Sequence, residues 1–189
     1  GSILLPLAQE GFDVIGVDLS PEMLTEADHK AMEAGVSVRL ACQDMTELDL
    51  GEQEDCILSL CDCMNYLIED GQLESAFQSI AAHMKKESLF LFDMNTEYKF
   101  REVLGQRAFG SAEEAAAYIW ENDYDEEEKI NEYYVSFFIA QENGLYERVE
   151  EYHYERAYSI EEIEQALQAA GLALLEVTDG YCFAPPQER

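Results

Sequence analysis

Three aspartates lie at or just after short apolar segments, where each segment is expected to end as a buried strand: Asp18, Asp44 and Asp93. Parallel strands end at the same edge of a sheet, and open α/β sheets bind their ligands at that edge. A carboxylate there can accept hydrogen bonds from both hydroxyls of a ribose. Asp44 can accept one from the amino group of an adenine, with Met45 against the base. The acids therefore indicate a nucleotide-type cofactor. The alternative for Asp18 is a surface acid that closes a turn, because acids are common where helices begin.

The segment FDVIGVDLSPEML, residues 12–24, contains the strand and helix that would position Asp18. Its β-branched residues predict a buried strand over residues 13–17. Ser20 is a favourable helix N-cap, and Pro21 suits the first helical position. A helix is therefore expected over residues 21–34, directly after the acid.

Short apolar segments alternate with helix-like segments through the first half of the chain, which is typical of a parallel, doubly wound α/β sheet. After residue 95 the pattern changes to longer alternating segments with turn signals, typical of an antiparallel β-meander. We expect residues 1–96 and 159–189 to form an α/β cofactor-binding domain, and residues 97–158 to form an inserted helix and antiparallel subdomain. The remaining expected elements are helices over residues 1–10, 71–84, 97–104 and 159–170, strands over residues 36–42, 56–60, 89–93 and 172–177, and an irregular segment from Gly180 to Arg189.

The predicted meander is rich in aromatic residues, from Tyr118 to Tyr154. Three interpretations stay open. One face packs as core, because alternate residues of a strand share a face. Alternatively, the meander covers a substrate pocket, where aromatic rings contact the substrate or hold a cation, or it forms a dimerisation surface. His153 lies in this segment, either as a general base or as a structural residue of the strand.

The composition is strongly acidic, with 41 Asp and Glu against 11 Lys and Arg and a net charge of −30. Such a chain repels nucleic acid and anionic lipid, so neither is expected as a partner, and a neutral or cationic small substrate is compatible. No apolar run is long enough to span a membrane. The five cysteines are expected to be reduced thiols of a cytoplasmic protein. Cys61 and Cys63 lack a second ligand pair, so no metal site is expected.

Residues 11–24 resemble class I S-adenosylmethionine-dependent methyltransferases, through the pattern Gly-Phe-x-Val-x-Gly-Val-Asp-x-Ser-x-x-Met-Leu. Asp44-Met45 falls where this family has its adenine-contacting acid. Leu60-Cys61-Asp62 falls at the strand end where the methionine part of the cofactor meets the substrate. Asn65-Tyr66-Leu67 is similar to a bacterial subgroup with small-molecule substrates. The resemblance implies a Rossmann-like fold and S-adenosyl-L-methionine as cofactor, with S-adenosyl-L-homocysteine as product. The cofactor-binding residues that it implies are Gly1, Asp18, Leu19, Met23, Asp44, Met45, Leu60 and Cys61.

Two parts of the family pattern have no counterpart in this sequence. One is the first strand with most of the glycine-rich turn, of which Gly1 would be the last glycine, and the other is the last strand. The first strand would belong between the strands expected at residues 13–17 and 56–60. We therefore expect the sequence to be a fragment of a longer chain.

The resulting prediction is transfer of a methyl group to a small-molecule acceptor by in-line displacement. Asp62, Tyr66 and His153 are the candidate catalytic residues for removing a proton from the acceptor. Two alternatives stay open. A domain without its donor loop would be a non-catalytic binding or interaction module that uses the meander to contact a partner. An NAD-dependent oxidoreductase also has an acid at the second strand, but no Tyr-x-x-x-Lys pair is present.

Overall fold

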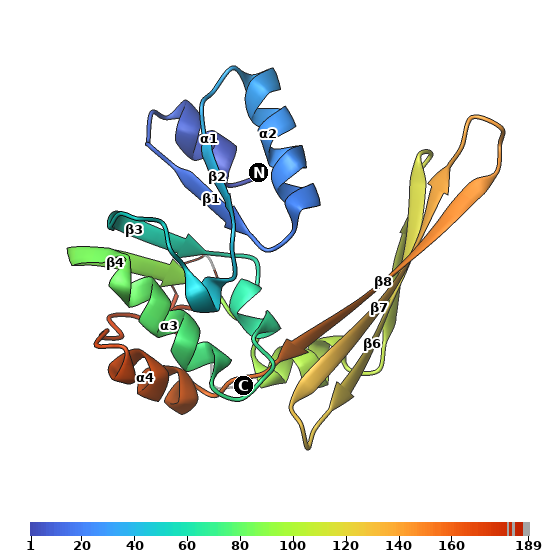
Figure 1. Ribbon diagram of the computed structural model, residues 1–189. Helices are drawn as coiled ribbons and strands as arrows, with labels where there is room; N and C mark the ends of the chain where they lie inside the picture. The colour runs from blue at the N-terminus through green and yellow to red at the C-terminus, as the bar shows by residue number, and fades with distance from the viewer. Residues whose placement is uncertain (181, 183, 187–189) are drawn as a thin grey trace. The chain divides into compact units, whose positions relative to one another are not determined.

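The computed structural model describes residues 1–180, 182 and 184–186, and its strands and helices are shown in Figure 1. The chain divides into two compact units, one formed by Gly1–Ile57 with Glu74–Leu89 and the other by Leu58–Leu73 with Phe90–Arg189. We describe each unit by itself. The domain boundaries that we expected at residues 96 and 158 stay a prediction.

The first unit begins with α1 (Leu4–Gln9), β1 (Ile15–Asp18), α2 (Pro21–Ala34) and β2 (Arg39–Cys42). β1 and β2 are parallel, with Ile15 opposite Arg39 and Asp18 opposite Cys42. Gly16 lies in the middle of β1. A Cβ atom there would come within 2.9 Å of the Leu40 side chain and 3.1 Å of the Leu4 side chain. Glycine therefore lets α1 and β2 close over the strand.

The helix α2 has the bounds that the sequence predicts. The hydroxyl of Ser20 accepts a hydrogen bond from the backbone N–H of Met23 at 3.1 Å, and Pro21 is the first helical residue. Gly35 ends the helix in the left-handed conformation, with a φ of 67°. The buried face carries Ala27 and Ala31. These local signals determine the helix, because each one satisfies or ends the chain of backbone hydrogen bonds at its own end.

A second pair of strands consists of β3 (Glu54–Ser59) and β4 (Met84–Phe92). The backbone N–H of Glu54 donates to His83 O at 2.7 Å, and that of Asp93 donates to Ser59 O at 3.2 Å. The first bond joins the starts of the two strands and the second joins their ends, so β3 and β4 run parallel. The α/β class with parallel strands is confirmed, although the parallel strands of the described chain form two separate pairs. Along the chain, η1 (Met45–Glu47) lies between β2 and β3, and η2 (Cys63–Tyr66) and α3 (Gln72–Ala82) lie between β3 and β4.

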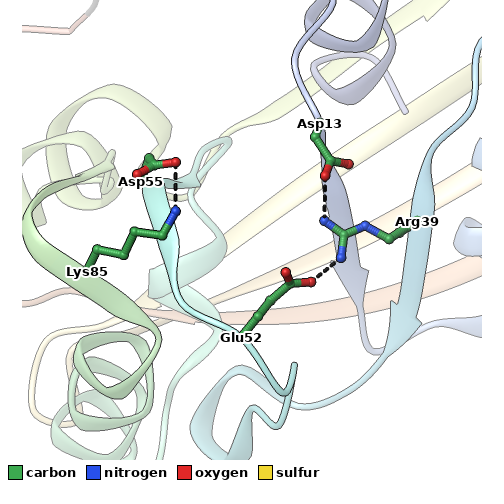
Figure 2. A network of polar contacts seen from close by, with 5 residues as sticks. All are labelled: Asp13, Arg39, Glu52, Asp55 and Lys85. Carbon is green, nitrogen blue, oxygen red and sulfur yellow. Dashed lines mark hydrogen bonds and ion pairs between the residues drawn. The ribbon is translucent and has the colours of Figure 1, made fainter.

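Exposed ion pairs lie near the starts of the strands in the first unit (Figure 2). The Arg39 guanidinium contacts the Asp13 carboxylate at 3.1 Å and also the Glu52 carboxylate. The Lys85 ammonium lies 2.8 Å from the Asp55 carboxylate. The helix expected over residues 71–84 ends at Ala82, because β4 starts at Met84 and Lys85 pairs with a residue of β3.

The second unit contains a four-stranded antiparallel sheet in the order β5-β6-β7-β8. Its strands are β5 (Ala108–Ala112), β6 (Ala116–Asp125), β7 (Ile130–Ala140) and β8 (Tyr146–Arg156). The inserted β-meander is thus confirmed, with β5 as an additional edge strand. β5 was not expected, because four of its five residues are Ala, Gly or Ser, which favour a strand weakly; it forms a hairpin with β6, the next strand along the chain. The exposed Tyr118 and Val149 leave the outer half of the meander open to both interpretations as a pocket cover and as a dimerisation surface.

The core of the second unit lies between the meander and η3 (Lys99–Leu104), a π-helical turn. Phe100 is fully buried, and its ring stacks on that of Tyr124 with 5.9 Å between the centroids. One face of the meander therefore supplies core residues, as the alternating pattern predicts. These residues pack against η3. The cluster consists of Phe100, Leu104, Tyr124, Tyr133 and Ala157, with Trp120 and Val135 at its edge.

The helix expected over residues 159–170 is α4 (Ile160–Ala169), which begins with a capping box. Ser159 Oγ accepts from the backbone N–H of Glu162 at 3.2 Å, and the Glu162 carboxylate accepts from the backbone N–H of Ser159 at 2.8 Å. The strand expected over residues 172–177 is wrong, because this segment is irregular and pairs with no strand among the residues that the structure describes. The irregular segment expected from residue 180 onward falls partly outside the described residues. In the part of the chain that the structure describes, no helix has the length and apolarity needed to cross a bilayer.

Replacing Phe100 by alanine should lower the free energy of unfolding by about 3–5 kcal/mol, because it removes a fully buried ring and leaves a cavity. Urea unfolding followed by circular dichroism measures this. Phe12→Ala is the matched control, since Phe12 is exposed. Equal losses in the two variants would contradict the assignment of Phe100 to the core.

Candidate functional site

In the first unit, the carboxylate of Asp18 lies at the end of β1 with one oxygen bound and one available. Oδ1 accepts a hydrogen bond from the backbone N–H of Ser20 at 2.9 Å, which holds the side chain beside the start of α2. No hydrogen bond from the described residues reaches Oδ2. Leu19 and Met23 flank this carboxylate in the sequence and are 69% and 55% exposed. An available carboxylate oxygen next to exposed apolar side chains suits a ribose and the groups attached to it.

Asp44 lies at the same edge as Asp18, because β2 ends at Cys42, opposite Asp18. Its Oδ1 accepts from the backbone N–H of Thr46 at 2.8 Å and from its hydroxyl at 2.7 Å. The side chain thereby caps η1, with Met45 partly buried behind it. The structure therefore brings two of the expected acids to neighbouring strand ends of the first unit.

Gly1 lies against α2, where a Cβ atom would be 3.5 Å from the Cα of Ala27. Its carbonyl accepts a hydrogen bond from the backbone N–H of Leu5 at 3.0 Å. Its predicted role in the cofactor turn is untested by these contacts and stays a prediction.

In the second unit, the chain makes an unusual turn directly after β3. Cys61 and Asp62 both have left-handed backbones, with φ of 64° and 55°. For residues other than glycine this conformation costs about 1–2 kcal/mol each. Such strain persists where surrounding contacts enforce it, and it occurs preferentially at functional sites. The backbone N–H of Asp62 donates to Asp93 Oδ1 at 3.3 Å, so Asp93, the third expected acid, helps to hold the turn. The predicted roles of Leu60 and Cys61 in cofactor binding stay predictions.

Asn65 holds η2 in place from inside the unit, where its side chain is fully buried. Its amide nitrogen donates to the carbonyl oxygens of Asn95 at 3.0 Å and of Arg156 at 2.8 Å, and its oxygen accepts from the backbone N–H of Asn95 at 2.8 Å. This network connects three segments that are distant in the sequence. The sequence offered Asn65 only as part of a motif, without a role.

Tyr66 and His153, which were selected separately from the sequence, lie side by side in the structure. The Tyr66 hydroxyl is 3.2 Å from His153 Nδ1, and the two rings meet edge to face. His153 Nε2 is in turn 3.2 Å from the Glu151 carboxylate. Glu151 was missed, although the strand pattern contained the signal that residues two apart on a strand share a face.

The protonation states in this chain of contacts follow from the surroundings of Tyr66. Burial, followed by the negative charges of Glu155 and Asp62, raises the pKa of Tyr66 to about 12. The hydroxyl therefore keeps its proton at neutral pH and donates it to His153 Nδ1. The Nε2–H of His153 then donates to Glu151. We assign this tautomer from the hydrogen-bond partners.

A buried carboxylate that sequence reasoning missed lies beside this group. Glu155 is 3% exposed, and its Oε2 accepts from Asn95 Nδ2 at 2.9 Å and from the Tyr133 hydroxyl at 3.0 Å. Asn95 Nδ2 also donates to Asp62 Oδ2 at 2.8 Å. Burial, with a further contribution from the Asp62 charge, raises the pKa of Glu155 to about 7. Among the described residues, no cluster of three or more His, Cys, Asp or Glu side chains has the arrangement of a metal site.

Comparison with known proteins identifies relatives along the whole chain. The sequence profile of a methyltransferase domain matches residues 1–87. A protein of Geobacillus sp. (strain WCH70), whose name places it provisionally among the methyltransferases, is 35% identical over 188 residues, which cover 100% of this chain and 76% of that protein.

Solved structures agree with these matches. An S-adenosylmethionine-dependent methyltransferase from Clostridium acetobutylicum is 35% identical, with a TM-score of 0.89 over 96% of this chain and 73% of that chain. An amino pentose methyltransferase from Micromonospora echinaspora, solved with S-adenosylmethionine bound, is 20% identical, with a TM-score of 0.72 over 90% of this chain and 70% of that chain. At that identity the second structure shows the fold alone.

The raised pKa of Glu155 predicts a pH dependence of stability. The folded chain holds a proton on this carboxyl that the unfolded chain releases near pH 4.5, so stability should fall as the pH rises from about 4.5 to 7. Glu155→Gln removes this contribution. The difference in the free energy of unfolding between this variant and the wild type should therefore shift by up to about 3 kcal/mol in favour of the variant as the pH rises from 5 to 8. Urea unfolding at several pH values measures the difference. Glu147→Gln, at an exposed position of the same strand, is the control, and an equal gain there would contradict the prediction.

Proposed function

Because this chain belongs to the S-adenosylmethionine-dependent methyltransferases, we propose that it transfers a methyl group to a small-molecule acceptor and releases S-adenosyl-L-homocysteine. The cofactor is S-adenosyl-L-methionine, as in the family. The observation that carries the proposal is the contact of Tyr66 with His153 and of His153 with Glu151, which forms a route for removing a proton from an acceptor.

The residues of the first unit fit this cofactor. Asp18 keeps one carboxylate oxygen for a ribose hydroxyl, and the exposed Leu19 and Met23 supply apolar surface beside it. Asp44 can accept a hydrogen bond from an adenine amino group through its remaining oxygen. When bound, S-adenosylmethionine would supply a methyl group already activated by the positive sulfur, so that an acceptor lone pair bonds to the methyl carbon in line as the carbon–sulfur bond breaks and S-adenosylhomocysteine leaves. The protein therefore mainly has to bind, to orient and to accept a proton.

The three residues of the second unit divide these tasks. Tyr66 is partly exposed, so its oxygen can contact an acceptor hydroxyl or amine. As the acceptor loses its proton to this oxygen, the Tyr66 proton moves to His153 Nδ1. The resulting imidazolium is stabilised by the Glu151 carboxylate at Nε2. Asp62 is the second candidate for contacting the acceptor, through the oxygen that Asn95 leaves available.

The charge of the chain supports a small-molecule acceptor. A net charge of −30 disfavours approach to polyanions, whereas neutral and cationic small molecules are not repelled. The alternatives of a non-catalytic module and of an NAD-dependent oxidoreductase find no support in the relatives, which carry methyltransferase names.

Replacing Asp18 by asparagine should weaken binding of S-adenosylhomocysteine by roughly 10–100-fold, because a charged hydrogen-bond acceptor is lost. Isothermal titration calorimetry with the wild type and the variant measures this. Asp28→Asn, at an exposed position of α2, is the control and should bind as the wild type does. Unchanged affinity in Asp18→Asn, or preference of the wild type for NADH, would overturn the cofactor assignment.

Replacing His153 by glutamine should lower kcat by about 10²–10⁴-fold, because the group that accepts the Tyr66 proton is lost. Methyl transfer from radiolabelled S-adenosylmethionine to a panel of amines, phenols, alcohols and carboxylic acids first identifies an acceptor, on which kcat is measured. His29→Gln, on the exposed side of α2, is the control. An unchanged kcat in His153→Gln would show that this histidine is structural.

A further inference from the structure

One amide group in the second unit holds two carboxylates at once. Asn95 Nδ2 donates one hydrogen to Asp62 Oδ2 at 2.8 Å and the other to Glu155 Oε2 at 2.9 Å. Its Oδ1 accepts from the Lys99 ammonium at 2.5 Å. Both backbone polar atoms of Asn95 bind the side chain of Asn65.

These partners permit only one orientation of the Asn95 amide. Turning it over would place the amide oxygen against two carboxylates and the amide hydrogens against an ammonium group, so that attractive contacts would become repulsive. The side chain is also 8% exposed, which limits competition from water. Asn95 is therefore a rigid clamp rather than an adaptable surface group.

The clamp acts on the strained turn that follows β3. Asp62 has a left-handed backbone, is partly exposed, and has no hydrogen bond from the described residues on its Oδ1. Held through Oδ2, this side chain presents Oδ1 in one fixed direction. Without the clamp, the carboxylate would be free to rotate and the turn could relax toward an ordinary backbone conformation.

Glu155 cannot contact an acceptor, because it is 3% exposed, so any role in the reaction must act through Asn95. Its Oε2 accepts both from Asn95 and from the Tyr133 hydroxyl, which joins the meander to the turn. A proton on this carboxyl can reside on Oε1, so both hydrogen bonds persist in either charge state. The clamp is thus independent of the titration of Glu155.

We propose that Asn95 and Glu155 are positioning residues for methyl transfer, which hold the carboxylate of Asp62 toward the acceptor. The inference rests on the proposed function, since it assigns Asp62 to the acceptor side of the reaction. It predicts that the hydrogen-bonding capacity of residue 155 matters and that its charge does not.

Two substitutions of Glu155 separate these properties. Glu155→Gln keeps an oxygen that can accept from both Asn95 and Tyr133, whereas Glu155→Leu removes it at similar volume. Glu155→Leu should lower kcat by roughly 10–100-fold, the effect of misplacing a reacting group, with the affinity for S-adenosylhomocysteine within about twofold of the wild type. Glu155→Gln should restore kcat to within about threefold of the wild type. Leu104→Ala is the control for lost stability, since Leu104 is buried in the core cluster beside η3.

A second readout does not need an acceptor. The side-chain amide of Asn95, observed by ¹⁵N NMR, should exchange slowly in the wild type and in Glu155→Gln, and rapidly in Glu155→Leu. Full kcat in Glu155→Leu, or an equal loss in both variants, would overturn the proposal, as would rapid amide exchange in the wild type. If the wild type methylates no acceptor, the proposed function fails, and the amide exchange still decides whether the clamp exists.

Discussion

The fully bonded side chain of Asn65 is the constraint on which the second unit depends. Its three hydrogen bonds join η2, the segment after β4 and the end of β8, all inside the protein. A buried amide is costly to leave unpaired, so separating any one of these segments from Asn65 would lower the stability of the unit. Tyr66, the next residue in the chain, is thereby placed beside His153, and Asn95 beside Asp62. The candidate chemistry of this unit follows from one structural amide.

Hydrogen bonds hold the strained backbone of the turn after β3 in place. Two consecutive left-handed residues would not persist in an isolated peptide. Here the backbone of Asp62 is bound by Asp93 and its side chain by Asn95, which offsets the cost. The proposed cofactor-binding residues Asp18 and Asp44 of the first unit need no such strain. Asp18 and Asp44 are held by hydrogen bonds to residues two positions further along the chain, as ordinary capping groups.

Prediction succeeded where signals were local and failed where they were not. The helix α2 was expected at its observed bounds from Ser20, Pro21 and Gly35. By contrast, β4 begins five residues before the expected start, because Met84 and the residues after it pair with β3 rather than extend the helix. The strand expected over residues 172–177 has the right residues but lacks a neighbouring strand. β-Structure depends on its partners, and a single segment does not contain them.

The sequence by itself determined the α/β class, the helix caps, the meander and the acids at the strand ends, because periodicity and capping act within a few residues. It also identified Tyr66 and His153 as reactive types without relating them. Only the tertiary structure decided that they touch, that Glu151 lies behind His153, and that Asn95 joins Asp62 to Glu155. Except for the pair His153 and Glu151, these contacts link residues 33 to 87 positions apart, from Asn95 and Asp62 to Tyr66 and His153. Burial makes the hydrogen bond between Asn95 and Glu155 obligatory, a property that no short segment of sequence expresses.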